Sequence, residues 1–271
     1  MNNWTGERLE TFVHTRDTIE HLHRYAVVSS YIKDKVVLDI ASGEGYGSNL
    51  MSKEASFVYG IDIDEATIQA AKAKYKKENL NFLSGSTSKI PLENNSIDVV
   101  VSFETIEHHD EHDQMIVEVK RVLKPNGIFI LSTPDKLYYS DKRGYNNKFH
   151  VKELYKHEFE VLINKYFERN QFLNQRYING NSIIQKCETN QLEFYTGSFT
   201  SLDIVKIDAL YLISIASDFD FEEQQLSVFE GSQVEKDNYY EKRVVPVYNS
   251  NSYKLGHFLL IPLSLLKRFL K

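Results

Sequence analysis

Glycines at every second position follow a short apolar segment that carries an acid. The segment is Val36–Ile40, with Asp39 near its end, and Gly43, Gly45 and Gly47 come after it. Because glycine has no side chain, the backbone can turn sharply there and approach a ligand closely. A helix beginning after this loop points its free N–H groups into the same space. The order predicts a strand, a tight loop and a helix start that together bind a nucleotide-like cofactor.

A second acid ends the next apolar segment, Phe57–Asp62. Asp62 lies roughly 20 residues beyond Gly43, the distance at which the tip of a second parallel strand comes beside the first. A carboxylate there can accept hydrogen bonds from both hydroxyls of a ribose. The alternative role for Asp62 is to cap the following helix, but Asp64 is better placed for that.

Two histidines are the candidate proton acceptors. His108 and its neighbour His109 follow the apolar segment Ile97–Phe103, close to Glu104 and Glu107. Histidine titrates near neutrality, so His108 can take the proton of a hydroxyl group without an extreme pKa shift. The alternative is a structural role for Glu107 and His108, in which they cap and anchor the loop.

His150 is the second candidate, in the segment NNKFHVKEL. It either caps or packs the next helix, or it joins His108 in one cleft as an acid–base pair. The histidine spacing does not favour a metal site, since His21 and His23 face different ways on a helix and His108 and His109 are adjacent. The carboxylates that could still recruit Mg²⁺ are Asp110, Glu111 and Asp113. Because the histidine spacing is unfavourable, we nevertheless expect no metal site.

The elements that must position these residues alternate between strand and helix patterns. The expected strands are Val36–Ile40, Phe57–Asp62, Leu80–Ser84, Ile97–Phe103 and Gly127–Thr133. The expected helices are Thr18–Lys33, Tyr46–Lys53, Glu65–Lys77 and Asp113–Leu123. Ile97–Phe103 has no polar face, which is typical of a strand buried on both sides of a parallel sheet. The alternation predicts right-handed crossovers and a doubly wound α/β fold.

The glycine loop resembles motif I of class I S-adenosylmethionine-dependent methyltransferases. Its spacing is G-x-G-x-G, preceded by Asp39, Ala41 and Ser42. A dinucleotide fingerprint needs G-x-G-x-x-G, and Ser48 stands where its third glycine would be. The resemblance continues through NSIDVVVSFETIEHH and RVLKPNGIFILSTP as far as Pro134. In LNFLSGSTSKIPL, Ser86 replaces the usual acid of this family.

The resemblance implies S-adenosyl-L-methionine as cofactor and a Rossmann-like, mostly parallel sheet of seven strands. An antiparallel C-terminal hairpin, Glu168–Tyr177 with Ala209–Asp218, would close it, with residues 185–205 as an inserted connection. His108 is the favoured base, because it matches the histidine of a Glu-His pair in the family that the chain resembles. Arg24 either pairs with the cofactor carboxylate or is a surface arginine. The candidate cofactor-binding residues are Arg24, Asp39, Ala41, Gly43, Gly45, Asp62, Ile63, Ser86, Thr87 and Phe103.

Shorter segments resemble methyltransferases of bacterial surface-polysaccharide (O-antigen or capsule) biosynthesis. These segments are WTGERLE, EHLHRY, NKFHVKEL and FLNQRYINGNSII. The resemblance implies methyl transfer to a hydroxyl of a sugar or glycan acceptor, lipid-linked or free. The alternatives are a quinone or secondary-metabolite methyltransferase and a catalytically inactive S-adenosylmethionine-binding protein. A formal net charge of −6 argues against a nucleic-acid partner.

The sequence divides into a helical N-terminal lid (1–35), a methyltransferase domain (36–225) and a C-terminal tail (226–271). The tail ends in YKLGHFLLIPLSLLKRFLK, which is apolar and flanked by basic residues. It is either an interfacial membrane helix or a helix that packs in a homo-oligomer. The polar start MNNWTGERLE and the single cysteine predict a cytoplasmic protein without disulfides, peripheral at the inner face of the membrane if the tail binds lipid.

Overall fold

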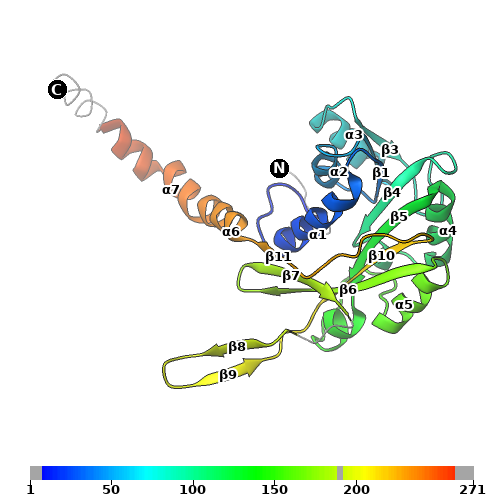
Figure 1. The fold of residues 1–271 in the computed structure, drawn as a ribbon. Helices are drawn as coiled ribbons and strands as arrows, with labels where there is room; N and C mark the ends of the chain where they lie inside the picture. Colours follow the sequence, from blue (N-terminus) through cyan, green and yellow to red (C-terminus); the bar gives the residue numbers. More distant parts are fainter. Residues whose placement is uncertain (1–7, 188–191, 260–271) are drawn as a thin grey trace.

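A mixed β-sheet forms the centre of the computed structural model, which describes residues 8–187 and 192–259 (Figure 1). Its described strands run in the order β11-β7-β6-β10-β5-β4-β1-β2-β3. Their bounds are β1 Val36–Ile40, β2 Phe57–Asp62, β3 Leu80–Ser84, β4 Ile97–Phe103, β5 Leu123–Pro134, β6 Arg169–Ile178, β7 Asn181–Lys186, β10 Tyr211–Ser217 and β11 Ser227–Glu230. Strands β1 to β5 pair in parallel, and β10 is antiparallel to both β5 and β6.

Helices cover both faces of this sheet, as Figure 1 shows. On one face lie α1 (Arg16–Ile32), α2 (Tyr46–Met51) and α3 (Glu65–Lys74). On the other lie α4 (His112–Val122) and α5 (Lys156–Asn164). The doubly wound α/β architecture is therefore confirmed.

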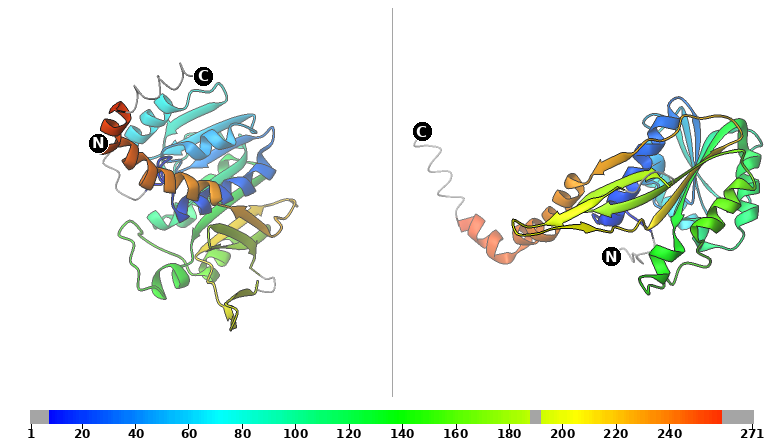
Figure 2. Two further views of the ribbon diagram at one scale, coloured as in Figure 1. Left: turned by 90° about the vertical axis from the view of Figure 1, so that its left-hand side faces the viewer. Right: turned by 60° about the horizontal axis from the view of Figure 1, so that its bottom comes forward.

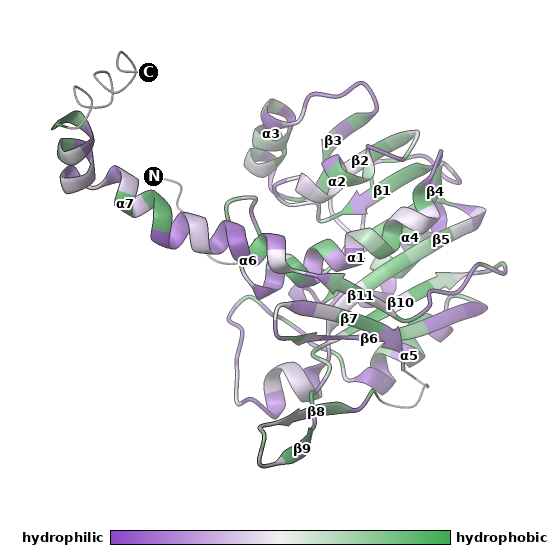
Figure 3. Cartoon of the chain, turned by 60° about the vertical axis from the view of Figure 1, so that its left-hand side comes forward, coloured by the Kyte–Doolittle hydropathy of each residue, from purple (hydrophilic) through white to green (hydrophobic). Residues whose placement is uncertain are grey.

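Strand β4 shows why its sequence has no polar face. Val99 and Val101 pack into the core under α1, whereas Val100 packs into the core under α4. Successive side chains of a strand point to opposite faces, so a strand covered on both sides needs apolar residues at every position. Figure 3 shows the apolar residues gathered on these central strands.

The sheet has nine strands within the described residues, so the predicted count of seven is wrong. The antiparallel pairing of β6 with β10 matches the expected hairpin. The additional strands are β7, which pairs with β6, and β11, which pairs with β7. Both are short, and β7 carries polar residues at Ser182 and Gln185, so neither has a strong strand pattern of its own. The segment expected as a plain connection also contains a separate hairpin of β8 (Phe194–Gly197) and β9 (Leu202–Val205).

The observed packing bears on two of the expected domain boundaries. Helix α1, which lies in the segment expected as a lid, packs on β4, β6, β7 and β11 of the main sheet. The sheet continues to Glu230, because β11 pairs with β7 beyond the expected boundary at residue 225.

The remaining described chain forms helices that project from the domain (Figures 1 and 2). They are α6 (Ser232–Tyr239), a π-helical turn (Tyr240–Val244), α7 (Val245–Asn249) and a helical segment over residues 251–259. Short helical turns also occur at Ile106–His108 and Leu137–Asp141. Among the described residues, no helix combines the length and apolar character needed to span a bilayer.

Candidate functional site

The glycine loop between β1 and α2 has the backbone that only glycine adopts easily. Gly43 and Gly45 have φ angles of +53° and +89°. A β-carbon on Gly45 would lie 2.7 Å from the ring of Phe82, and one on Gly47 would lie 2.0 Å from the hydroxyl oxygen of Tyr25. The expectation of a tight turn is therefore confirmed, and the close approaches at Gly45 and Gly47 are to the protein's own aromatic rings. The close approach of this loop to a ligand stays a prediction.

Asp62 lies at the tip of β2, beside the glycine loop. Its Oδ2 accepts a hydrogen bond from the Gly43 N–H at 3.0 Å, and its Oδ1 accepts one from the Asp64 N–H at 2.9 Å. Asp64 caps α3 by accepting hydrogen bonds from the backbone of Ala66 and Thr67. The helix cap is thus Asp64, as expected, and Asp62 joins the loop to the second strand.

Asp39 lies buried beneath the loop, with 2% of its surface exposed. Its Oδ2 accepts a hydrogen bond from the Ser48 hydroxyl at 2.7 Å. Burial raises the pKa of Asp39 to about 7, the Ser48 hydrogen bond opposes this shift, and the charge of Asp62 adds to it. Ser48, which replaces the third glycine of a dinucleotide motif, therefore links the end of β1 to α2.

The other candidate cofactor residues line the same edge of the sheet. Ala41 has a φ angle of +57°, and Phe103 packs edge-on against Tyr25 with the ring centroids 5.2 Å apart. Ile63 is 75% exposed, which is unusual for a large apolar side chain directly after a buried strand. Ser86 and Thr87 follow β3, where the Gly85 N–H donates to the Asp62 carbonyl at 3.1 Å. These residues gather at the carboxyl ends of the parallel strands, where ligands of doubly wound sheets bind.

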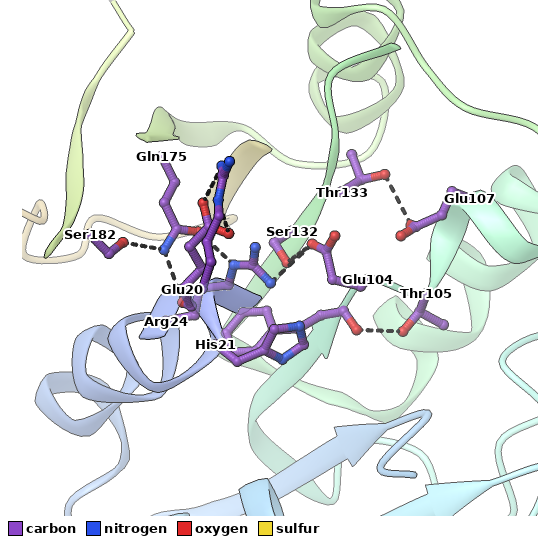
Figure 4. Close-up of polar contacts among 12 residues, drawn as sticks. Glu20, His21, Arg24, Glu104, Thr105, Glu107, Ser132, Thr133, Gln175 and Ser182 are labelled. Atoms are coloured by element: carbon purple, nitrogen blue, oxygen red, sulfur yellow. Dashed lines mark hydrogen bonds and ion pairs between the residues drawn. The ribbon is translucent and has the colours of Figure 1, made fainter. Parts of the chain in front are cut away.

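Arg24 is buried, so the alternative of a surface arginine is wrong. It is 1% exposed, its Nε donates to Gln175 Oε1 at 2.7 Å, and its guanidinium lies 4.4 Å from the ring centroid of Tyr211. Its Nη1 lies 3.2 Å from Glu104 Oε1, an ion pair without hydrogen-bond geometry. Within residues 8–187 and 192–259 neither terminal nitrogen of Arg24 has a hydrogen-bond partner. Figure 4 shows Arg24 facing Glu104.

A buried polar network around Arg24 was not expected from the sequence. Gln175 donates to the Glu20 carbonyl at 2.9 Å and to the Ser182 hydroxyl at 2.7 Å (Figure 4). The Glu20 carboxylate is fully buried and accepts two hydrogen bonds from Arg16. The network holds α1 against β6 and β7, and through this packing it orients Arg24. The polar residues of this network come from distant parts of the chain, so no local sequence pattern predicts that they meet.

Two carboxylates after β4 lie among hydroxyl groups of β5 (Figure 4). Glu104 has a φ angle of +50° and accepts a hydrogen bond from Ser132 at 2.7 Å. Glu107 Oε2 accepts one from Thr133 at 3.0 Å. Burial holds the pKa of Glu107 well above its usual range, and the nearby charge of Glu104 raises it further.

The two candidate histidines come together, although they lie far apart in the sequence. The rings of His108 and His150 meet edge-on with their centroids 5.2 Å apart. His108 Nδ1 donates to the Phe149 carbonyl at 3.0 Å, and His150 Nδ1 donates to Glu153 at 2.5 Å. His109 lies elsewhere, with its Nε2 3.4 Å from the Thr87 hydroxyl. The structure therefore places His108 and His150 in one cluster and separates His109 from it.

Aromatic rings connect this histidine pair to Arg24. Tyr139 stacks on His150 with the centroids 5.6 Å apart, and it also contacts Tyr211 at 5.8 Å. Tyr211 in turn lies under the guanidinium of Arg24. Tyr139 belongs to the short helical turn Leu137–Asp141 that follows β5. The structure makes it part of a continuous aromatic wall between Arg24 and the histidines.

The comparison with known proteins agrees with this geometry. Residues 38–131 match the family model described as a methyltransferase domain. The chain superimposes on a S-adenosylmethionine-dependent methyltransferase of Thermotoga maritima, described as a possible histamine N-methyltransferase (TM-score 0.54, 16% identity, 74% of this chain and 90% of that one). It also superimposes on a putative methyltransferase of Bacillus halodurans (TM-score 0.54, 12% identity, 73% and 99%). Residues 38–131 are therefore similar to the methyltransferase domain that this family model describes.

Curated relatives are similar to part of the chain and not to all of it. A probable S-adenosylmethionine-dependent methyltransferase of Mycolicibacterium smegmatis is 39% identical over 128 residues, which are 47% of this chain and 49% of that protein. The phthiotriol/phenolphthiotriol dimycocerosates methyltransferase of Mycobacterium tuberculosis is 31% identical over 98 residues, 35% of this chain and 36% of that protein. The chain thus spans about half the length or less of these relatives.

Proposed function

We propose that this chain transfers the methyl group of S-adenosylmethionine to a hydroxyl oxygen of a sugar or glycan. The observation that carries the proposal is the His108–His150 pair, which lies beside the aromatic wall that leads to Arg24. Imidazole groups can accept a hydroxyl proton near neutral pH. Tyrosine rings stack on sugar faces, and tyrosine hydroxyls and asparagine amides exchange hydrogen bonds with sugar hydroxyls.

The residues around the glycine loop fit the cofactor. In the proposed complex the Asp62 carboxylate, which accepts the Gly43 N–H of the loop, also accepts hydrogen bonds from the ribose hydroxyls. The exposed side chain of Ile63 offers an apolar surface for the adenine ring. The terminal nitrogens of Arg24 make no hydrogen bond in the described chain, so they suit the cofactor carboxylate, which would share this arginine with Glu104. The cofactor supplies a methyl group already activated on a sulfonium.

The histidine pair would handle the proton. The Nδ1 hydrogen bond of His108 to a carbonyl requires the proton on Nδ1, so the basic lone pair is on Nε2. In the proposed step Nε2 accepts the hydroxyl proton of the acceptor. The acceptor oxygen forms its bond to the methyl carbon while the carbon–sulfur bond breaks, and that electron pair stays on sulfur. The chain must hold the oxygen, carbon and sulfur nearly in line.

An acceptor panel tests this proposal. The purified chain would be incubated with S-adenosylmethionine and either nucleotide sugars, lipid-linked glycans, catechols or quinols, and the products analysed by mass spectrometry. Methylated sugar together with S-adenosylhomocysteine would support the proposal. Turnover of quinols alone would replace it with the small-molecule alternative. Cofactor binding without turnover of any acceptor would favour the inactive cofactor-binding alternative.

We further propose that the C-terminal helices bring the enzyme to the inner face of an anionic membrane, where lipid-linked acceptors are found. Large apolar side chains on these projecting helices are exposed: Val247, Tyr248, Leu255, Phe258 and Leu259. The basic residues expected to attract lipid headgroups, Lys267, Arg268 and Lys271, lie outside the described residues. The competing proposal is a homo-oligomer that buries the same apolar side chains.

A further inference from the structure

Glu107, His108 and His150 form a cluster of three groups that can each offer one ligand atom. These ligand atoms all lie within 4.8 Å of one another. Glu107 and His108 belong to the turn after β4, and His150 belongs to the loop before α5. The two loops are tied together, since the backbone N–H groups of Val151 and Lys152 both donate to the Glu107 carbonyl. The cluster is thus held by the fold, although its members are distant in sequence.

Both histidines carry the tautomer that a metal-binding imidazole needs. The Nδ1 of His108 donates to the Phe149 carbonyl, and the Nδ1 of His150 donates to the Glu153 carboxylate. With the proton on Nδ1, the lone pair of each ring is on Nε2. Metal-binding histidines almost always donate their other N–H to a carbonyl or carboxylate in this way, which fixes the ring orientation and increases its basicity.

Glu107 supplies the independent observation. Its side chain is 1% exposed, and Oε2 accepts the Thr133 hydrogen bond. Its Oε1 is buried without a hydrogen-bond partner anywhere in the described chain. A buried oxygen left without a partner is costly, and such groups in folded proteins are normally satisfied. A bound cation would satisfy this oxygen.

We propose that Glu107, His108 and His150 bind a divalent first-row transition metal cation such as Zn²⁺, Mn²⁺ or Co²⁺. Two imidazole nitrogens and one carboxylate oxygen suit these ions, whereas Mg²⁺ and Ca²⁺ prefer oxygen ligands alone. Binding draws the three ligand atoms closer together, because zinc–ligand bonds are about 2.0–2.2 Å long. It also displaces the Asn147 amide, which donates to His150 Nε2 at 2.9 Å. Three protein ligands leave a coordination position open for an acceptor oxygen.

This inference rests on the proposed methyl transfer for its catalytic meaning, and it changes how the proton leaves. A hydroxyl bound to a cation has a lowered pKa and releases its proton to solvent. The resulting oxygen attacks the methyl carbon as described above, and the Nε2 lone pairs bind the metal instead of the proton. The proposal replaces the sequence-based expectation that the chain has no metal site. That expectation considered neighbours in sequence, and His150 joins the cluster only through the fold.

The test measures metal binding directly, without cofactor or acceptor. The full chain would be treated with a chelator, dialysed and titrated with Co²⁺, and the visible absorption of the bound ion recorded. One Co²⁺ per chain, displaced by Zn²⁺, is expected. Glu107→Gln, His108→Ala and His150→Ala should each abolish the absorption band, and Glu153→Gln should weaken binding by about 10–100-fold because it orients a ligand. The exposed His157→Ala is the matched control and should bind like the parent.

The outcomes separate this proposal from the proposed function. A chain that methylates its acceptor but binds no Co²⁺ overturns the metal site and leaves the methyl transfer standing, and turnover after complete metal removal overturns the catalytic role of the metal. A chain that binds Co²⁺ through these residues but transfers no methyl group to any acceptor supports the metal site and overturns the proposed methyl transfer. Glu107→Gln keeps the size of the side chain and an acceptor for Thr133, so it remains informative where a histidine variant fails to fold. Unchanged Co²⁺ binding in folded Glu107→Gln would overturn the proposal.

Discussion

Arg8 places its Nη2 3.3 Å from Oδ1 of Asp62, the carboxylate that also accepts the Gly43 N–H. Its Nη1 reaches Asp64 and Thr67 at the start of α3. A segment from the far N-terminus therefore lies over the candidate ribose site. Residues 1–7 of the expected lid lie outside the described residues.

We predict that Arg8→Ala tightens S-adenosylmethionine binding by a few-fold. The side chain of Arg8 is 37% exposed, so its ion pair with Asp62 contributes at most about 1 kcal/mol. This ion pair must break when the ribose hydroxyls bind the Asp62 carboxylate, so the variant that lacks it binds the cofactor more tightly. Titration calorimetry measures the change, with the exposed Arg169→Ala as control. Weaker binding would show instead that Arg8 contacts the bound cofactor.

Replacing Asp62 with alanine should weaken S-adenosylmethionine binding by roughly 2–4 kcal/mol, or about 30- to 1,000-fold. The variant loses two hydrogen bonds to the ribose and the acceptor for the Gly43 N–H. Asp62→Asn keeps one acceptor oxygen and should lose less. An affinity unchanged in folded Asp62→Ala would remove this residue from the site.

His108→Ala or His150→Ala should lower turnover by about 10²–10⁴-fold while the affinity for cofactor stays near that of the parent. Both residues lie in the cluster beside Tyr139 and not at the glycine loop. Steady-state kinetics and calorimetry on the same preparations measure the two quantities. His109→Ala is the neighbouring control, and full turnover in both cluster variants would show that neither histidine takes part.

The buried carboxyl of Asp39 predicts a pH-dependent stability. Its folded pKa is raised to about 7 from an ordinary value of 3.8, so between these pH values the folded state binds a proton that the unfolded state has lost. This contribution to the free energy of unfolding is therefore full below about pH 4 and is lost as the pH rises toward 7. Urea unfolding of Asp39→Asn should show a flatter dependence in that window. The exposed Asp34→Asn serves as control, and an identical slope in Asp39→Asn would contradict the assignment.

The projecting C-terminal helices predict salt-sensitive membrane binding. The full chain should sediment with anionic liposomes and be released at high salt, because basic residues near a charged surface contribute about 1 kcal/mol each and salt screens them. Removal of residues 253–271 should abolish sedimentation and leave methyl transfer to a soluble acceptor intact. Light scattering distinguishes the competing outcome, in which the parent ignores liposomes and the truncated chain changes its oligomeric state.

Local patterns in the sequence were sufficient to predict the strands with clear apolar runs, the glycine loop and one helix cap. The apolar runs give β1 to β4 with the bounds that the structure has, because β1, β2 and β4 are covered on both faces, and the edge strand β3 buries Leu80 and Phe82 on one face. The glycine loop and the cap at Asp64 were likewise predictable, since both depend on the backbone of a few consecutive residues.

Only the tertiary structure decided the features that join distant residues. Strands β7 and β11 exist because they extend an edge that β6 offers, and their own short, partly polar sequences give no strong pattern. Arg24 is buried because Gln175 and Glu104 supply partners from other elements, whereas its local sequence is equally compatible with a surface helix. Glu107, His108 and His150 meet because two loops at the carboxyl edge of the sheet are pinned to one another. Periodicity records which face of an element is apolar, but it carries no information about which distant loop will lie beside it.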